Sequence, residues 1–174
     1  MSTSQELNSG LSFQALTEEQ RGSFLPTPAP VLVRFEQGDC VYKWTGYDFV
    51  RISRTTGKEQ VSEYWCPWNE LAIGPLRVPG FKDLRTRYGN VGGSVGRPQE
   101  FARARNAVTH QWNEMTSILK ARFRKPVWGF VGRTAPQRFY QDRDKPEVLA
   151  NVTWIGGDFQ LCIPNLTPEW IEKL

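Results

Sequence analysis

The sequence predicts an α+β domain with a largely antiparallel β-sheet, one long amphipathic helix and loops rich in proline and glycine. Short runs of β-branched and aromatic residues, with alternating polar positions, occur both early and late in the chain. Between them, residues 99–122 repeat apolar side chains at steps of three and four, as one face of a helix does. Strands grouped in this way, without a helix between each pair, are typical of α+β proteins.

Length and composition fit one folded domain. The chain has 174 residues, of which 39% are hydrophobic, and it contains seven tryptophans. We expect residues 1–30 to form an N-terminal helix and a proline-rich lead-in, and residues 31–174 to form a single domain of catalytic type. No run approaches the roughly 18 apolar residues of a membrane span. The N-terminus also lacks a secretory signal pattern, so we expect a cytoplasmic protein, or one delivered into a target-cell cytosol, with no membrane partner.

Charge and reactive residues narrow the possible chemistry. The net charge of +4 and the pI near 9.1 fit an anionic ligand such as a dinucleotide or RNA, and equally fit many enzymes. Cys40, Cys66 and Cys162 match no zinc spacing and no disulfide framework. His110 is the one histidine in the sequence. One histidine is too few for a histidine-rich metal site, and a Ser-His-Asp triad would depend on this residue alone. We therefore expect no metal.

The first third of the chain predicts a capped helical turn followed by short strands. Thr17 and Gln20 have the spacing of a capping box, and the prolines of residues 26–30 cannot continue that helix. The expected strands, separated by turn residues, are Val31–Phe35, Cys40–Trp44 and Phe49–Ile52. In the next segment, Val61–Trp68, three aromatic rings fall within five residues. They either pack in the core or form a wall for a planar ligand.

The middle of the chain predicts a glycine-rich loop and then the long helix. Residues 88–96 are rich in glycine but lack the Gly-Lys-Ser/Thr ending of a P-loop, so they form either a surface loop or a phosphate cradle. Pro126 ends the helix. Just before it, Arg122, Arg124 and Lys125 suit the negative end of the helix dipole or, alternatively, contact nucleic acid.

The last third predicts further strands and a tight turn. The expected strands are Val127–Gly132, Val148–Ile155 and Phe159–Ile163. Gly156-Gly157-Asp158 tolerates positive φ, which predicts a hairpin between the last two strands. Gln160 follows two residues after this turn and faces away from the apolar side of its strand. It is either a solvated side chain or a group aimed into a cleft.

Three of these features occur in an order that resembles the ADP-ribosyltransferase superfamily, and more narrowly its small bacterial toxin domains that cleave NAD. They are a basic residue on an early strand, a serine beside aromatic residues, and the late Gly-Gly-Asp-Phe-Gln sequence. The resemblance implies that Arg34 or Lys43 holds the dinucleotide. It further implies that Ser62 with Trp65 or Trp68 lines the nicotinamide, and that Gln160 lies at the reacting ribose.

This resemblance implies an NAD-dependent ADP-ribosyltransferase or NAD glycohydrolase, acting as a bacterial toxin or effector. NAD would be the substrate, the acceptor a protein or a nucleic acid, and an immunity or antitoxin protein the neutralising partner. Cleavage builds positive charge on the ribose, and a neutral glutamine stabilises that charge less than a carboxylate does. Gln160 in place of the glutamate of transferases therefore favours hydrolysis or an unusual acceptor. The alternative is a non-enzymatic nucleic-acid- or protein-binding domain, which mild basicity and exposed aromatic rings would serve.

Overall fold

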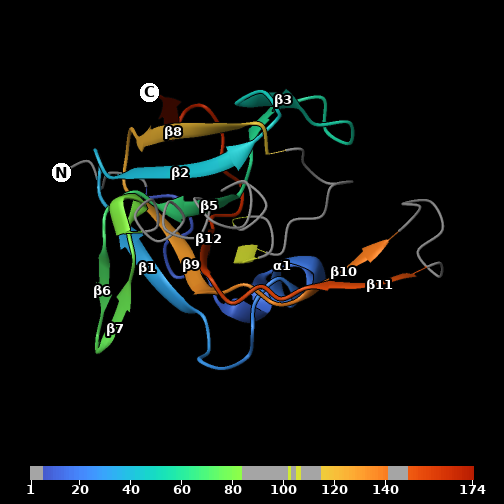
Figure 1. The fold of residues 1–174 in the computed structure, drawn as a ribbon. Coiled ribbons are helices and arrows are strands. Elements are labelled where there is room, and N and C mark those ends of the chain that lie inside the picture. The colour runs from blue at the N-terminus through green and yellow to red at the C-terminus, as the bar shows by residue number, and fades with distance from the viewer. Residues whose placement is uncertain (1–5, 84–101, 103–104, 107–114, 141–148) are drawn as a thin grey trace.

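A seven-stranded antiparallel sheet is the centre of the protein, as a computed structural model shows (Figure 1). The structure describes residues 6–83, 102, 105–106, 115–140 and 149–174. The strand order is β1-β9-β12-β5-β2-β8-β13. These strands span Val31–Phe35 (β1), Cys40–Thr45 (β2), Tyr64–Pro67 (β5), Ser117–Phe123 (β8), Val127–Arg133 (β9), Phe159–Cys162 (β12) and Ile171–Lys173 (β13).

Three two-stranded ribbons accompany this sheet. They pair β3 (Val50–Ile52) with β4 (Glu59–Val61), β6 (Leu71–Ile73) with β7 (Leu76–Val78), and β10 (Gln137–Tyr140) with β11 (Leu149–Trp154). The β10–β11 ribbon projects from the body of the molecule as an arm (Figure 1).

The prediction of an α+β domain with one long helix over residues 99–122 is wrong. Ser117–Phe123 is strand β8, and the helices among the described elements are the short η1 (Phe13–Ala15) and α1 (Glu18–Gly22). In β8, Leu119, Ala121 and Phe123 are buried and alternate with less buried residues, which is the period of a strand. At Leu119, the apolar spacing that predicted the helix is equally compatible with a strand. Most of the predicted helix before β8 lies outside the described residues.

The sheet turns back on itself at two corners. β1 and β2 follow each other in the chain, as do β8 and β9, yet neither pair lies side by side in the sheet. The two connecting turns are hydrogen-bonded to each other, since Gly38 N–H donates to Phe123 O (2.9 Å) and Phe123 N–H donates to Asp39 O (3.0 Å). The rings of Phe35 and Phe123 consequently meet, with centroids 5.6 Å apart. The sheet therefore has an inner, concave face that encloses the main core.

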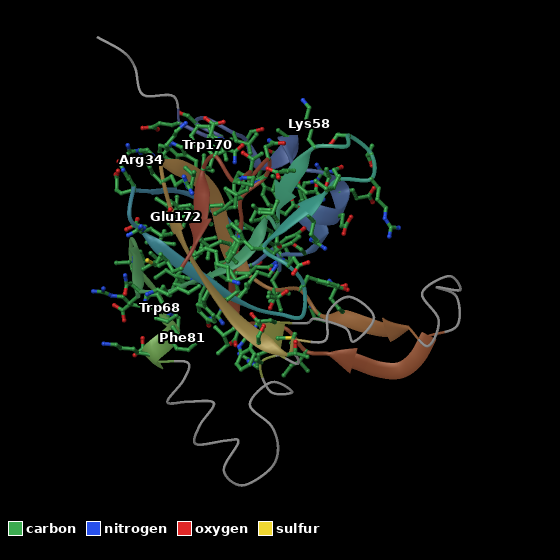
Figure 2. The ribbon with its side chains drawn as sticks, turned by 90° about the horizontal axis from the view of Figure 1, so that it is seen from above. Arg34, Lys58, Trp68, Phe81, Trp170 and Glu172 are labelled. Atoms are coloured by element: carbon green, nitrogen blue, oxygen red, sulfur yellow. The ribbon has the colours of Figure 1, made fainter. Side chains whose placement is uncertain are left out.

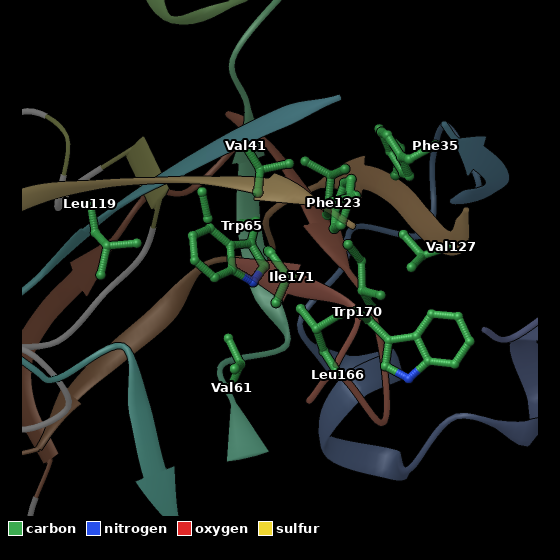
Figure 3. Close-up of a cluster of buried hydrophobic side chains, with 14 of the residues drawn as sticks. Phe35, Val41, Val61, Trp65, Leu119, Phe123, Val127, Leu166, Trp170 and Ile171 are labelled. Carbon is green, nitrogen blue, oxygen red and sulfur yellow. The ribbon is translucent and has the colours of Figure 1, made fainter. Parts of the chain in front are cut away.

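The inner face is filled by apolar side chains from nearly every strand of the large sheet (Figure 3). Trp65 of β5 and Leu161 of β12 are opposite each other in the strand register, and both are buried in this cluster. Burying one such large side chain stabilises the fold by about 1.5–3 kcal/mol. Other members are Val41, Leu119, Phe123, Val131, Leu166, Trp170 and Ile171.

The outer face of the β1-β9-β12 half is covered by the N-terminal segment. Leu16 and Phe24 are buried against Phe130 and Cys162, which point to this face. The capping box predicted for α1 is confirmed: Gln20 N–H donates to Thr17 Oγ1 (3.1 Å) and Thr17 N–H donates to Gln20 Oε1 (2.8 Å). Among the described helices, none is long and apolar enough to cross a membrane.

The turn at residues 156–158 has the predicted backbone but not the predicted partners. Gly156 and Gly157 both have positive φ, 65° and 91°. A Cβ at Gly156 would lie 2.6 Å from Thr134 O, so no side chain fits there. However, β11 pairs with β10 and β12 pairs with β9 and β5, so the hairpin predicted here is wrong. Strand pairing depends on distant segments, which the local alternation does not reveal.

Candidate functional site

A small pocket lies on the inner face, where β2 approaches its end. Lys43 of β2 and Ser62, just before β5, lie on its wall, and the segment from Tyr47 to Arg51 forms another side. The cavity volume is about 10 Å³, which is room for about one water molecule. The lining residues are Lys43, Thr45, Tyr47, Asp48, Phe49, Arg51, Ser62, Trp65 and Leu119.

Strand alternation brings Lys43 into this otherwise apolar region. Val41, two residues earlier, is buried in the inner core, and Lys43 pairs in register with Leu119, another member of that core. Tyr42 instead points to the opposite face and packs with Met115. Because side chains along a strand alternate between faces, Lys43 must share the face of Val41.

Lys43 and Ser62 form the closest polar contact in the pocket. Lys43 Nζ donates to Ser62 Oγ at 2.5 Å, and Nζ lies 5.5 Å from the centre of the Trp65 ring. Burial, together with the nearby charge of Arg51, lowers the pKa of Lys43 to about 8. Among the described residues, no carboxylate forms an ion pair with Lys43. Lys43 is therefore a partly buried cation that has no ion pair with a described carboxylate.

Ser62 is fixed from three directions. Trp65 Nε1 donates to Ser62 O at 2.6 Å, which bends the chain just before β5. Tyr64 N–H donates to Ser62 Oγ at 3.4 Å, in addition to the contact from Lys43. The hydroxyl is thus held at the pocket wall, partly exposed to solvent.

Six pocket residues were not predicted as site residues from the sequence, and among them Tyr47, Asp48 and Arg51 carry polar or charged groups. Arg51 lies on β3, is exposed, and has its guanidinium carbon 5.2 Å from the centre of the Tyr47 ring. Among the described residues that line the pocket, Asp48 carries the one carboxylate. The strand containing Arg51 was predicted, but its position over the pocket depends on how the β3–β4 ribbon folds back, for which the sequence has no local signal.

Arg34 lies outside this pocket. It is on β1 and forms ion pairs with Glu6 (2.7 Å) and with Glu36. Glu6 also accepts a hydrogen bond from Trp128 Nε1 (2.7 Å). The hydrogen bonds from Arg34 and Trp128 lower the pKa of Glu6. Arg34 thus has two carboxylate partners, and it lies well apart from Trp68 (Figure 2).

Trp68 is part of a different aromatic cluster. Its ring stacks on Phe81 with centroids 4.5 Å apart and an interplanar angle of 9° (Figure 2). Lys120 Nζ lies 4.1 Å from the centre of the Trp68 ring, and Tyr42 meets it edge to face. Tyr42 points away from the pocket face, so this cluster lies on the other side of β2.

Gln160 points to the outer face of the sheet. Leu161, its neighbour on β12, is buried in the inner core, so Gln160 lies on the opposite side from Lys43 and Trp65. Its Nε2 donates to Ser23 O (2.9 Å) and to Ser23 Oγ (3.1 Å). The structure therefore brings Lys43, Ser62 and Trp65 together, and it places Arg34, Trp68 and Gln160 elsewhere.

The other features that the sequence singled out do not join the pocket. Arg122 and Arg124 form ion pairs with Glu172, and Lys125 with Glu169. These cations lie in β8 and the turn after it rather than at the end of a helix. His110 and the glycine-rich loop of residues 88–96 lie outside the described residues. Among the described residues, no three His, Cys, Asp or Glu side chains gather as metal ligands would.

Comparisons with protein-family models, with curated proteins and with solved structures find no match to this chain.

Proposed function

We propose that this protein binds NAD across the mouth of the Lys43 pocket and cleaves its nicotinamide–ribose bond, by hydrolysis or by transfer of ADP-ribose. The observation that supports the proposal is the meeting of Lys43 on β2 with Ser62, just before β5, and Trp65 at the start of β5, residues that the family resemblance implies for NAD binding. Arg51 adds a second cation to the same pocket.

A diphosphate would balance the positive charge of this pocket, whose two cations, Lys43 and Arg51, outnumber its one carboxylate, Asp48. A half-buried cation without an ion pair is unfavourable, and an anionic ligand relieves that cost by charge-assisted hydrogen bonds. Because the pKa of Lys43 is about 8, its ammonium is mostly charged at pH 7. Arg51 stays charged throughout and is exposed beside the opening.

The size of the cavity determines how the ligand would lie. About 10 Å³ admits a single small group, so the dinucleotide would lie across the opening rather than inside it. Trp65 is 2% exposed and supplies the floor of the pocket rather than a stacking surface. Tyr47, which is 47% exposed, offers the ring on which a nicotinamide or adenine would stack.

Asp48 is the group that we assign to the reacting sugar. Loss of nicotinamide leaves positive charge on the ribose, and a carboxylate stabilises that charge better than an amide does. Asp48 lines the same pocket as the two cations, whereas the amide of Gln160 is held by Ser23 on the other face. The assignment of Gln160, which the family resemblance implies, is the competing hypothesis.

One experiment separates the two assignments. NAD consumption by the purified protein is measured for wild type, Lys43→Met, Asp48→Asn and Gln160→Ala. We expect wild type to consume NAD, and Lys43→Met and Asp48→Asn to reduce the rate by about 10²-fold or more, as loss of one stabilising group does. Gln160→Ala should keep the rate of wild type. The reverse pattern, with only Gln160→Ala inactive, would move the site to the outer face.

A wild-type protein that neither consumes nor binds NAD would end the enzymatic proposal. Retention of that protein on nucleic acid, falling steeply as salt is added, would then favour the non-enzymatic binding domain. A circular-dichroism spectrum of each variant shows whether a lost activity reflects a lost fold.

A further inference from the structure

We propose that Ser62 is a nucleophile for which Lys43 is the general base, so that the pocket also accepts the acyl group of a small activated ester. This activity goes beyond NAD cleavage and does not depend on it. It rests on the short contact between Lys43 Nζ and Ser62 Oγ, 2.5 Å, at the wall of a pocket that opens to solvent.

The contact has the geometry that nucleophilic catalysis requires. A serine hydroxyl becomes a nucleophile when a neutral base lies within about 2.6–3.2 Å of it, and lysine fills this role in serine–lysine enzymes. Lys43 Nζ is 2.5 Å from Ser62 Oγ, within hydrogen-bond distance. It lies 5.5 Å from the centre of the Trp65 ring, which cannot accept a proton. Ser62 is the one hydroxyl to which Lys43 is hydrogen-bonded among the described residues.

The surroundings make Lys43 a usable base near neutral pH. An unperturbed lysine is almost fully protonated there and cannot accept the proton of a hydroxyl. Burial lowers the pKa of Lys43 to about 8, so a fraction of about one in ten is neutral at pH 7 and most of it above pH 9. The titratable groups near it are Arg51, whose charge adds to this shift, Cys66, whose charge would oppose it, and Tyr47 and Asp48, which line the same pocket.

Donors for a developing oxyanion lie beside the hydroxyl. Tyr64 N–H already points at Ser62 Oγ, 3.4 Å away. The guanidinium of Arg51 lines the same pocket and forms no ion pair with any described residue, so its donors can reach new negative charge there. The cavity of about 10 Å³ has room for about one water molecule, so the acyl group would reach Ser62 from the pocket mouth, and a small group such as acetyl fits there best.

The reaction needs the ester and water and no other reagent. Ser62 Oγ attacks the ester carbonyl carbon while neutral Lys43 Nζ takes the hydroxyl proton. The tetrahedral intermediate collapses, the bond to the alkoxide breaks, and the ammonium of Lys43 returns the proton to the departing alcohol. Water then attacks the acyl-serine with Lys43 again accepting a proton, and the carboxylic acid and free Ser62 are released.

The test uses p-nitrophenyl acetate and the full-length protein. We expect release of p-nitrophenolate together with one acetyl group on Ser62, located by peptide mapping after an acid quench. The acylation rate should rise with pH through an apparent pKa near 8, following the neutral fraction of Lys43. Ser62→Ala should reduce the rate by about 10²-fold or more.

Lys43→Arg tests whether Lys43 acts as the base. The guanidinium keeps a positive charge in the pocket but cannot act as a base, since it stays protonated. Acylation of Ser62 should therefore be lost in this variant, while its circular-dichroism spectrum stays that of wild type. Acetylation that maps to Cys40 or surface lysines rather than Ser62 would overturn the proposal. An unchanged rate in Lys43→Arg would overturn it as well.

Discussion

Polar side chains on the two faces of the large sheet have different kinds of partner. On the outer face, the amide of Gln160 is hydrogen-bonded to Ser23, and Gln20 Nε2 donates to Glu63 Oε2 at 2.8 Å. These bonds tie the N-terminal segment to the sheet. On the inner face, the ammonium of Lys43 has the hydroxyl of Ser62 as its partner and no carboxylate among the described residues.

This difference separates structural from functional polar groups. A buried neutral group that is hydrogen-bonded to neutral partners adds about 1 kcal/mol of stability, and its hydrogen-bonding groups are already occupied when a ligand arrives. A partly buried charge without a counter-charge lowers stability, and such groups concentrate at functional sites. By this criterion Gln160 and Ser23 hold the N-terminal segment in place, whereas Glu63, a half-buried carboxylate bonded to Gln20, is an exception on the outer face. The inner pocket remains the better candidate for chemistry because it gathers two cations, a carboxylate and a hydroxyl.

The largest effect expected concerns the N-terminal layer. Phe24 is 5% exposed and packs against the outer face. If this layer is as integral as the inner core, Phe24→Ala should lower the free energy of unfolding by about 3–5 kcal/mol, measured by urea denaturation. Phe123→Ala on the inner face, where Phe123 is 1% exposed, serves as the matched control and should lose a similar amount. A loss below about 1 kcal/mol for Phe24→Ala alone would show that the segment is only loosely attached.

The next effect is a pH dependence that belongs to the inner pocket. The pKa of Lys43 is about 8 when folded and 10.5 in its ordinary state. Between these values the unfolded chain binds more protons than the folded one, so the contribution of Lys43 to stability rises with pH. Lys43→Met should therefore be more stable than wild type at pH 7, and the gap should close by up to about 3 kcal/mol as the pH rises to 10.5.

The measurement for Lys43 compares urea denaturation of wild type and variant at each pH. Burial raises the pKa of Tyr64, but this residue is present in the two proteins and its contribution cancels. A gap that does not change with pH would show that the ammonium of Lys43 is solvated, and the contrast between the two faces would fail.

A smaller effect is expected at Gln160. Replacement by alanine removes both hydrogen bonds to Ser23 and should lower the free energy of unfolding by about 1–2 kcal/mol. Ser23→Ala keeps the bond to the backbone carbonyl but also removes the bond from Ser23 Oγ to Gln20 O (2.7 Å), so it should lose a similar amount. Binding of a pocket ligand should be unchanged in both variants, as measured by calorimetry. Loss of ligand binding without loss of stability in Gln160→Ala would contradict the structural role.

The smallest effect is expected at Arg34. Its ion pairs with Glu6 and Glu36 are on the surface, so Arg34→Ala should shift the thermal midpoint only slightly, and less as salt is added. Ligand binding at the inner pocket should not change. A marked loss of NAD binding in Arg34→Ala would instead support the outer face as the site.

The strands were largely predictable because their signal is local. Alternation and turn residues identified β1, β2, β9 and β12 within one residue or so of their bounds. The prediction of a helix over residues 99–122 was wrong because the apolar spacing up to Leu119 fits the period of a helix and the period of a strand. The hairpin at Gly156-Gly157 failed because β12 pairs with β9 and β5, which are distant in the chain. Pairing between remote segments depends on the whole core rather than on the residues of either strand.

The candidate site was predictable in part. Lys43, Ser62 and Trp65 were identified from residue type and order, and Gln160 was correctly expected to face away from the apolar side of its strand. The side on which Lys43 lies was not predictable, because Tyr42 and Trp44 make the opposite face of β2 as apolar as the face of Val41. Arg51 and Asp48 enter the pocket through the tertiary position of one small ribbon.

The hydrogen-bonded corners at Gly38 and Phe123 have a consequence for how the chain acquires its structure. These corners form only when β1 pairs with β9 and β2 pairs with β8. Each of these pairings closes a loop of many tens of residues. Loop-closure entropy opposes such encounters, and proteins dominated by remote strand pairs fold slowly. During synthesis, β8 gains its outer neighbour only after β13 has left the ribosome. The nascent protein should therefore expose an unpaired edge of β8 until then, and depend on chaperones during that interval.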